Sequence, residues 1–238
     1  MGRPPSVRTL ATVVVTLGIV AVIFGALAVA SLASNTRIAA NRLDIGEETQ
    51  LAIRSTDADV RLVEGTSTDV VIRARVKSGL RDTTYELRRR GDEIEVVGTC
   101  RRWLSPGCGV VVTVAVPARL PVLVATDSAD VVADGLRERV VTIATGSGSI
   151  RGRELGVQEF SARTDAGGVD AVFVEQPFAF KARTKSGDIM ARIPDGDIDY
   201  AVKVDSGSGE ARSELESVPE AKGIVQAVSD SGDIELRR

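Results

Sequence analysis

Phe180–Ala191 reads FKARTKSGDIMA and Val225–Leu236 reads VQAVSDSGDIEL, two copies of one pattern that decides the fold. In both copies, every second residue is apolar up to a Thr or Ser. A short turn of small and acidic residues follows, and the alternation then resumes. Such alternation indicates a β-strand with one buried side and one solvent-facing side. Each copy is therefore predicted to form a strand, a four-residue turn and a second strand.

The pattern occurs seven times, and each copy can be numbered from its Thr-like residue, the anchor: Ser55, Thr126, Thr145, Thr164, Thr184, Val204 and Ser229. The last six anchors are 19, 19, 20, 20 and 25 residues apart. A period of about twenty residues is typical of stacked units that bury their apolar sides only against their neighbours. The expected fold is all-β, either a β-solenoid or a stack of β-hairpins, and periodicity alone does not decide between these two.

The third residue after each anchor is always Ala or Gly, at Ala58, Ala129, Gly148, Gly167, Gly187, Gly207 and Gly232. Such a position is either crowded or, where Gly holds it, at positive φ. The neighbouring Asp and Ser residues also favour turns, so we interpret the SGD motif as turn chemistry rather than as a ligand-binding loop. On this interpretation, Gly187→Val should be costly. Gly187→Ala should be milder, because Ala already holds the position in two copies.

A segment without charged residues, Leu10–Ala33, precedes the repeats. As a helix it is long enough to cross a hydrocarbon core of about 30 Å. The alternative is a cleaved signal peptide, because Arg3 and Arg8 make a basic start and Ala28–Ala30 resembles a cleavage site. The apolar region of a signal peptide normally runs about 7–15 residues, and this one is longer. We therefore expect an uncleaved signal anchor that contacts the lipid bilayer through residues 10–33.

This anchor divides the chain into a cytoplasmic tail (1–9), the transmembrane helix (10–33), a linker (34–42) and an extracytoplasmic β-repeat domain (43–238). Within the domain, 63–121 is expected to form a β-meander that caps one end of the stack. At the other end, the charged Glu235–Arg238 would blunt the exposed strand edge. Ser213–Ala221 is expected to be a loop or a short surface helix.

Two cysteines, Cys100 and Cys108, enclose a short loop between β-like runs. An isolated pair of this kind is typical of a disulfide in an oxidising compartment. Metal binding is disfavoured, because the chain has no histidine and only these two cysteines. We therefore predict a Cys100–Cys108 bond and a single-pass protein of the cell membrane with its C-terminal domain outside the cytoplasm.

Catalysis is not expected, and we assign no catalytic, cofactor-binding or metal-binding residue. Without histidine, the usual general base is missing. The alternating carboxylates of Asp195–Asp199 resemble the start of a calcium loop, but Tyr200 stands where that loop needs Gly, so a turn is the preferred interpretation. The residues four positions after the last six anchors place no two acids in neighbouring copies, if the copies stack in chain order. One position after the anchors, only Asp205 and Asp230 would be acidic neighbours.

Charge and composition also disfavour nucleic acid as a partner. Without Arg3 and Arg8, the chain holds 28 basic and 33 acidic residues, and aromatic residues are scarce. The only basic concentration noted is Arg88–Arg90 together with Arg101–Arg102 beside Trp103. It is either a solvated hairpin surface or a patch for anionic envelope polymers or lipid headgroups.

The order of these segments resembles a known family. A membrane anchor is followed by STDADVRLVEG, then YELRRRGDEIEV, then VTVAVP, and then the tandem SGD copies. In this order they are similar to the putative-adhesin family of bacterial cell-envelope proteins, over Leu43–Arg238. The resemblance implies an all-β repeat domain at the cell surface, and it supplies no catalytic or ligand-binding residue.

The leading hypothesis is a membrane-anchored, non-catalytic surface protein that binds or organises envelope components, with an envelope polymer or a partner membrane protein as its candidate partner. An alternative is a sensory or regulatory ectodomain that acts through a partner membrane protein, since the cytoplasmic tail is too short to signal alone. A glycan-active enzyme is the third hypothesis, because solenoid folds can carry paired carboxylates.

Overall fold

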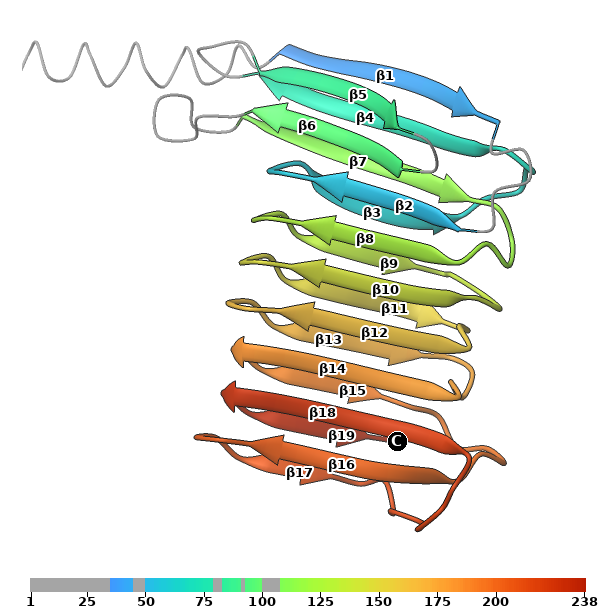
Figure 1. The fold of residues 1–238 in the computed structure, drawn as a ribbon, viewed down its shortest axis with the longest axis vertical. Helices are drawn as coiled ribbons and strands as arrows, with labels where there is room; N and C mark the ends of the chain where they lie inside the picture. Colours follow the sequence, from blue (N-terminus) through green and yellow to red (C-terminus); the bar gives the residue numbers. More distant parts are fainter. Residues whose placement is uncertain (1–34, 45–49, 79–82, 91–92, 100–107) are drawn as a thin grey trace, which may run out of the picture.

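The computed structural model describes residues 35–44, 50–78, 83–90, 93–99 and 108–238. In this part of the chain every regular element is a strand, and the nineteen strands form two sheets that pack face to face (Figure 1). The predicted all-β fold is confirmed. No helix that could cross a membrane occurs among the described residues. The helix predicted at Leu10–Ala33 lies outside them.

The ten-stranded sheet is called sheet A and the nine-stranded sheet is called sheet B. Each repeat contributes its first strand to sheet B and its second strand to sheet A, and the two strands form one coil of the stack. The seven coils built from the repeats are β2 (Leu51–Ser55) with β3 (Asp59–Glu64), β8 (Val122–Thr126) with β9 (Val131–Asp134), β10 (Val140–Thr145) with β11 (Ile150–Leu155), β12 (Glu159–Thr164) with β13 (Val169–Phe173), β14 (Ala179–Ser186) with β15 (Ile189–Arg192), β16 (Tyr200–Ser206) with β17 (Ala211–Ser213), and β18 (Gly223–Ser231) with β19 (Ile234–Arg237). Strands of neighbouring coils pair in parallel, whereas the two strands of one coil belong to different sheets. The stack is therefore a β-solenoid and not a series of hairpins.

The last two coils do not stack in chain order. The β18/β19 coil lies between β14/β15 and β16/β17, so that β16 and β17 form the end of the stack (Figure 1). The expectation that Glu235–Arg238 blunts the exposed edge is therefore wrong. The outer edge of β16 is instead partly covered by a loop, in which Val218 N donates to Tyr200 O at 2.9 Å and Val202 N donates to Ser217 Oγ at 3.0 Å. This loop occupies the segment for which a loop or short helix was expected.

The register also corrects the sixth repeat. Ser206, not Val204, pairs with the anchor Ser229, so this copy begins two residues later than the alternation suggested. The glycine equivalent to Gly232 in this copy is accordingly Gly209 rather than Gly207, and a Cβ on Gly209 would lie 2.2 Å from Gly232 O. A shift of two residues leaves every side chain on the same side of its strand, which is why the alternation could not reveal it.

At the other end, the segment 63–121 has two parts. Beyond the β2/β3 coil lie β1 (Asn35–Leu43), which precedes this segment, and its own strands β4 (Val70–Ser78), β5 (Thr84–Arg90), β6 (Glu93–Thr99) and β7 (Gly109–Val116). The last two of these pair in parallel with β2 and β3 and form an eighth coil. The first three pair antiparallel and close the stack. The segment 34–42 was expected to be a linker, and its described residues 35–42 supply most of an edge strand.

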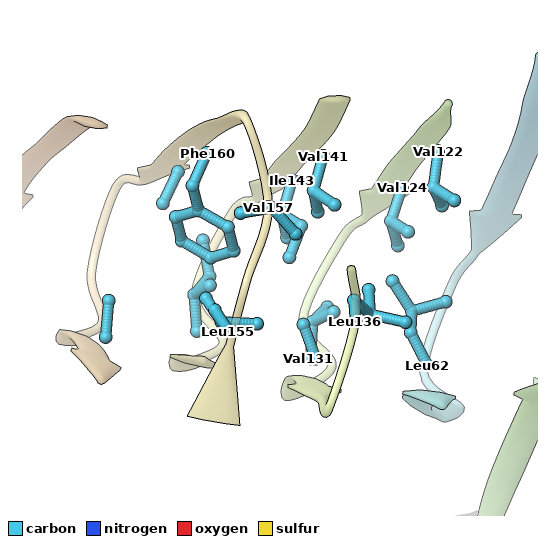
Figure 2. Close-up of a cluster of buried hydrophobic side chains, with 14 of the residues drawn as sticks. Leu62, Val122, Val124, Val131, Leu136, Val141, Ile143, Leu155, Val157 and Phe160 are labelled. Carbon is cyan, nitrogen blue, oxygen red and sulfur yellow. The ribbon is translucent and has the colours of Figure 1, made fainter. Parts of the chain in front are cut away.

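The core lies between the two sheets and is made of the inward-facing apolar residues of every coil (Figure 2). In six of the repeats the anchor hydroxyl at the end of the first strand is buried as well, and it bonds to a turn carbonyl. Thr184 Oγ1 donates to Gly167 O at 3.0 Å, and Thr164 Oγ1 donates to Gly148 O at 2.9 Å. Because a buried hydroxyl without a partner is costly, this ladder explains why the anchor is Ser or Thr.

Tyr200 gives a pH-dependent test of the packing at the β16 end. Its phenol donates to Pro177 O at 2.7 Å, and burial raises its pKa to about 12. The folded state therefore binds the phenolic proton more tightly than the unfolded state, whose pKa is about 10. This contribution to stability is complete below about pH 10 and is lost as the pH rises through 12.

The measurement uses Tyr85→Phe, which leaves Tyr200 as the only tyrosine of the chain. Ultraviolet titration of the folded variant should give a phenolate midpoint of about 12. In denaturant the midpoint should fall to about 10. Equal midpoints in the two states would contradict the burial of this phenol.

Candidate binding surfaces on the repeat stack

The outward side of sheet B carries five exposed basic residues on β12, β14 and β16. Lys185 is paired with Asp165 at 2.9 Å, and the remaining four are Arg163, Lys181, Arg183 and Lys203. We call these four the basic face. Arg163 and Arg183 are direct partners in the register of β12 and β14. Like charges directly opposite each other on neighbouring strands destabilise a sheet. The repulsion between Arg163 and Arg183 therefore lowers the stability of the sheet and favours the binding of an external anion.

The distance between the cations of the basic face, and the small number of acids beside them, suit an extended anion. Lys181 and Lys203 lie on either side of Gln226 in the register, so their strands are about 10 Å apart. None of the four cations forms an ion pair within the described ranges. Two exposed acids, Glu159 and Asp205, lie on the same side of the sheet, opposite Ala179 and Val228. The four cations are thus available to a ligand with several negative groups.

The basic run expected from the sequence makes local contacts instead. Arg88 pairs with Glu86 on its own strand, and Arg90 lies 3.9 Å from Glu95 on β6. Arg89 Nη1 donates to Asp44 O at 2.9 Å. These contacts fit the solvated hairpin interpretation. Arg101, Arg102 and Trp103 lie outside the described residues.

The acidic residues of the turns form a hydrogen-bonded column, which we call the aspartate ladder: Asp59, Asp130, Asp188 and Asp233. Each Oδ1 accepts the backbone N–H of the neighbouring coil, at Asp130 (3.1 Å), Ser149 (2.8 Å), Asp233 (2.9 Å) and Glu210 (2.9 Å). These carboxylates therefore satisfy backbone donors at the turns.

Two expectations about acidic neighbours are wrong, each for its own reason. Asp188 and Asp233 are adjacent in the ladder, because the β18/β19 coil stacks directly on β14/β15. Asp205 faces Val228 and not Asp230, because the sixth copy is shifted by two residues. Chain order and alternation had suggested the opposite in both cases.

The possible calcium loop at Asp195–Asp199 also makes local contacts. Asp195 Oδ1 accepts from Arg238 Nη1 at 3.0 Å, and Ile198 N donates to Gln176 Oε1 at 2.9 Å. No group of three or more His, Cys, Asp or Glu side chains that could hold a metal ion occurs in the described part of the chain. Cys108 is buried just ahead of β7. Cys100 lies outside the described residues, so the Cys100–Cys108 bond stays a prediction.

Alternation alone could have located most of the basic face. Arg163 and Arg183 stand one residue before their anchors, where the pattern predicts an outward side chain. Reading this column across adjacent copies would have placed the two arginines side by side. The basic face contains no run of consecutive basic residues, because its side chains come from separate coils, so a basic run in the sequence does not reveal it.

Comparisons with known proteins address the family and the overall shape. Residues 121–237 match the family model described as Toastrack DUF4097. No curated protein matches the chain.

Two solved structures are similar to the chain over most of its length. A putative cell adhesion protein from Clostridium sporogenes ATCC 15579 is 8% identical, covers 85% of this chain and 99% of its own, and has a TM-score of 0.48. A putative adhesin from Bacteroides fragilis NCTC 9343 is 10% identical, covers 84% and 96%, and has a TM-score of 0.39. These similarities assign no role to any residue.

Proposed function

Residues 121–237 belong to the Toastrack DUF4097 family, and from this premise we propose that the chain is a membrane-anchored, non-catalytic protein of the bacterial cell envelope whose basic face binds an anionic envelope polymer. The observation that carries the proposal is the register pair Arg163 and Arg183, two like charges opposite each other without an ion pair in the described structure. A polyanion would relieve the repulsion and gain from both charges at once.

The rigid solenoid suits this role because it fixes the spacing of its outward side chains. Parallel strands about 4.8 Å apart hold the cations in one plane. A polymer with regularly spaced negative groups can therefore contact several cations without ordering any loop, which keeps the entropic cost of binding low. The proposal of a non-catalytic role is supported by the engagement of the turn carboxylates with backbone amides.

Charge reversal on the basic face tests polymer binding. Arg163→Glu/Arg183→Glu should weaken binding of the full-length protein to poly(glycerol phosphate) by at least about tenfold, since each surface cation contributes about 1 kcal/mol near a dense negative charge. Added salt should weaken wild-type binding, because these charges are exposed. Binding can be measured by biolayer interferometry, with dextran as the uncharged polymer.

Arg153→Glu/Arg192→Glu is the matched control. It makes the same charge change at two exposed arginines of sheet A that have no ion pair within the described ranges. This variant should keep most of the affinity. Equal losses in the two variants would show that only net charge matters and would remove the basic face as the site.

The membrane part of the proposal rests on the apolar Leu10–Ala33 and needs a separate experiment. The full-length protein should stay with the membrane after an alkaline carbonate wash, and external protease should cut its C-terminal domain in spheroplasts. Release by the wash would contradict a retained anchor. Mass spectrometry of non-reduced protein from the same membranes would test the Cys100–Cys108 bond.

A further inference from the structure

The aspartate ladder is interrupted in two successive coils. Its column, four residues after each anchor, holds Ser149 in the β10/β11 coil and Gly168 in the β12/β13 coil. The two backbone N–H groups that face these positions belong to Gly168 and Asp188. Neither N–H has a hydrogen-bond partner among the described residues, whereas the equivalent N–H groups of Asp130, Ser149 and Asp233 are each bonded to a carboxylate.

A hollow of about 460 Å³ opens at this interruption. Ser149, Gly168 and Asp188 line it, with Arg151 and Met190 beside them. Gly168 leaves room for a side chain, since a Cβ added there would meet only Asp188 O, at 3.3 Å. The two residues whose N–H groups have no acceptor in the described structure therefore line this hollow.

The charges around the hollow permit a further carboxylate. Arg151 lies on it, and its guanidinium is already 3.3 Å from Asp130 Oδ2. Two acids, Asp170 and Asp188, also line it. Two carboxylates already lie in adjacent coils elsewhere in the column, at Asp188 and Asp233. A bound carboxylate at the gap would stand in that same relation to Asp188.

We propose that this hollow is a binding site for the carboxylate group of a ligand, whose two oxygens accept hydrogen bonds from the N–H groups of Gly168 and Asp188. In the other coils each Asp Oδ1 accepts one such N–H. The internal copies set the geometry, with acceptor oxygens 2.8–3.1 Å from the amide nitrogens. The ligand is an acidic sugar or an acidic amino-acid residue, which share this chemistry. The site is distinct from the basic face and does not depend on it.

The experiment follows the two amide signals directly. Full-length protein carrying isotope-labelled glycine and aspartate is prepared in detergent micelles and titrated at constant ionic strength with glucuronate or, separately, with N-acetyl-aspartate amide. The Gly168 and Asp188 amide protons should move downfield with a dissociation constant of about a millimolar, as expected for so small a ligand. The amide of Asp233 should not move, because its N–H is already bonded.

Two substitutions at one position separate chemistry from volume. Gly168→Asp restores the missing carboxylate and should weaken binding at least about tenfold. Gly168→Ala adds a Cβ without an acceptor and should keep both shifts. A response to glucuronate alone identifies the acidic sugar, and a response to N-acetyl-aspartate amide alone identifies the acidic residue. No shift with either probe, or equal binding by Gly168→Asp and wild type, overturns the proposal.

Discussion

Arg139→Ala is expected to lower the free energy of unfolding by about 3 to 5 kcal/mol, one of the two largest effects predicted for this protein. The Arg139 side chain is fully buried, and its Nη2 lies 2.6 Å from both carboxylate oxygens of Glu64. Its other nitrogens donate to the carbonyls of Arg137 at 3.0 Å and Pro117 at 2.9 Å. Removing the guanidinium leaves these acceptors without their partner in the interior.

The position of Arg139 explains why the effect should spread. Its partners come from the end of β3, from the segment between β7 and β8, and from the corner between β9 and β10. The side chain thus joins three coils at the junction between the repeats and the capping strands. Burial lowers the pKa of Arg139, and the charge of Glu64 opposes that shift, so the cation depends on its partner.

Arg119→Ala is the control for Arg139→Ala. Arg119 also pairs with a glutamate, Glu138, at 2.6 Å, but both side chains are exposed. Its loss should change stability by less than about 1 kcal/mol. Urea denaturation of the two variants, followed by circular dichroism, makes the comparison. Similar midpoints would show that the buried pair does not hold the junction together.

The strands and their buried sides were predictable, whereas the order of the coils was not. Alternation is a local signal, and it correctly identified the anchors from Ser55 to Thr184 and at Ser229, whose hydroxyls are buried. Every coil carries the same pattern, however, so nothing local says which coil lies beside which. The chain places its last coil between two earlier ones, and only the paired register reveals this.

The candidate sites were also predictable only as far as local alternation reaches, because the sequence does not show which coils are neighbours. The outward direction of Arg163 and Arg183 follows from alternation, but their role depends on the two strands being neighbours. The aspartate ladder depends on a bond from a side chain to the backbone of the next coil, which periodicity does not encode. The interruption at Gly168 therefore became visible only beside its filled neighbours.

Gly187→Ala is the second large effect. The structure gives this substitution a larger cost in stability than the sequence suggested. The sequence suggested that Ala would be milder than Val, because Ala58 and Ala129 hold the equivalent position. Gly187 has a φ of +155°, and a Cβ built on it would lie 2.2 Å from Gly167 O, whereas neither alanine is at positive φ. The clash involves the Cβ atom itself, so Ala already incurs it.

We therefore expect Gly187→Ala to lower the free energy of unfolding by about 2 to 4 kcal/mol, through backbone strain and through separation of the two coils. Gly187→Val should be worse still, because a β-branched residue is especially strained at positive φ. Gly168→Ala is the matched control, because its Cβ would meet only Asp188 O at 3.3 Å.

Urea denaturation should show a lower midpoint for Gly187→Ala than for Gly168→Ala, with neighbouring coils unfolding together because each coil is stabilised by its neighbours. If the two alanine variants have the same stability, the turn can open to admit a Cβ. The Ala-or-Gly rule at this position would then reflect something other than the close approach of Gly167 O.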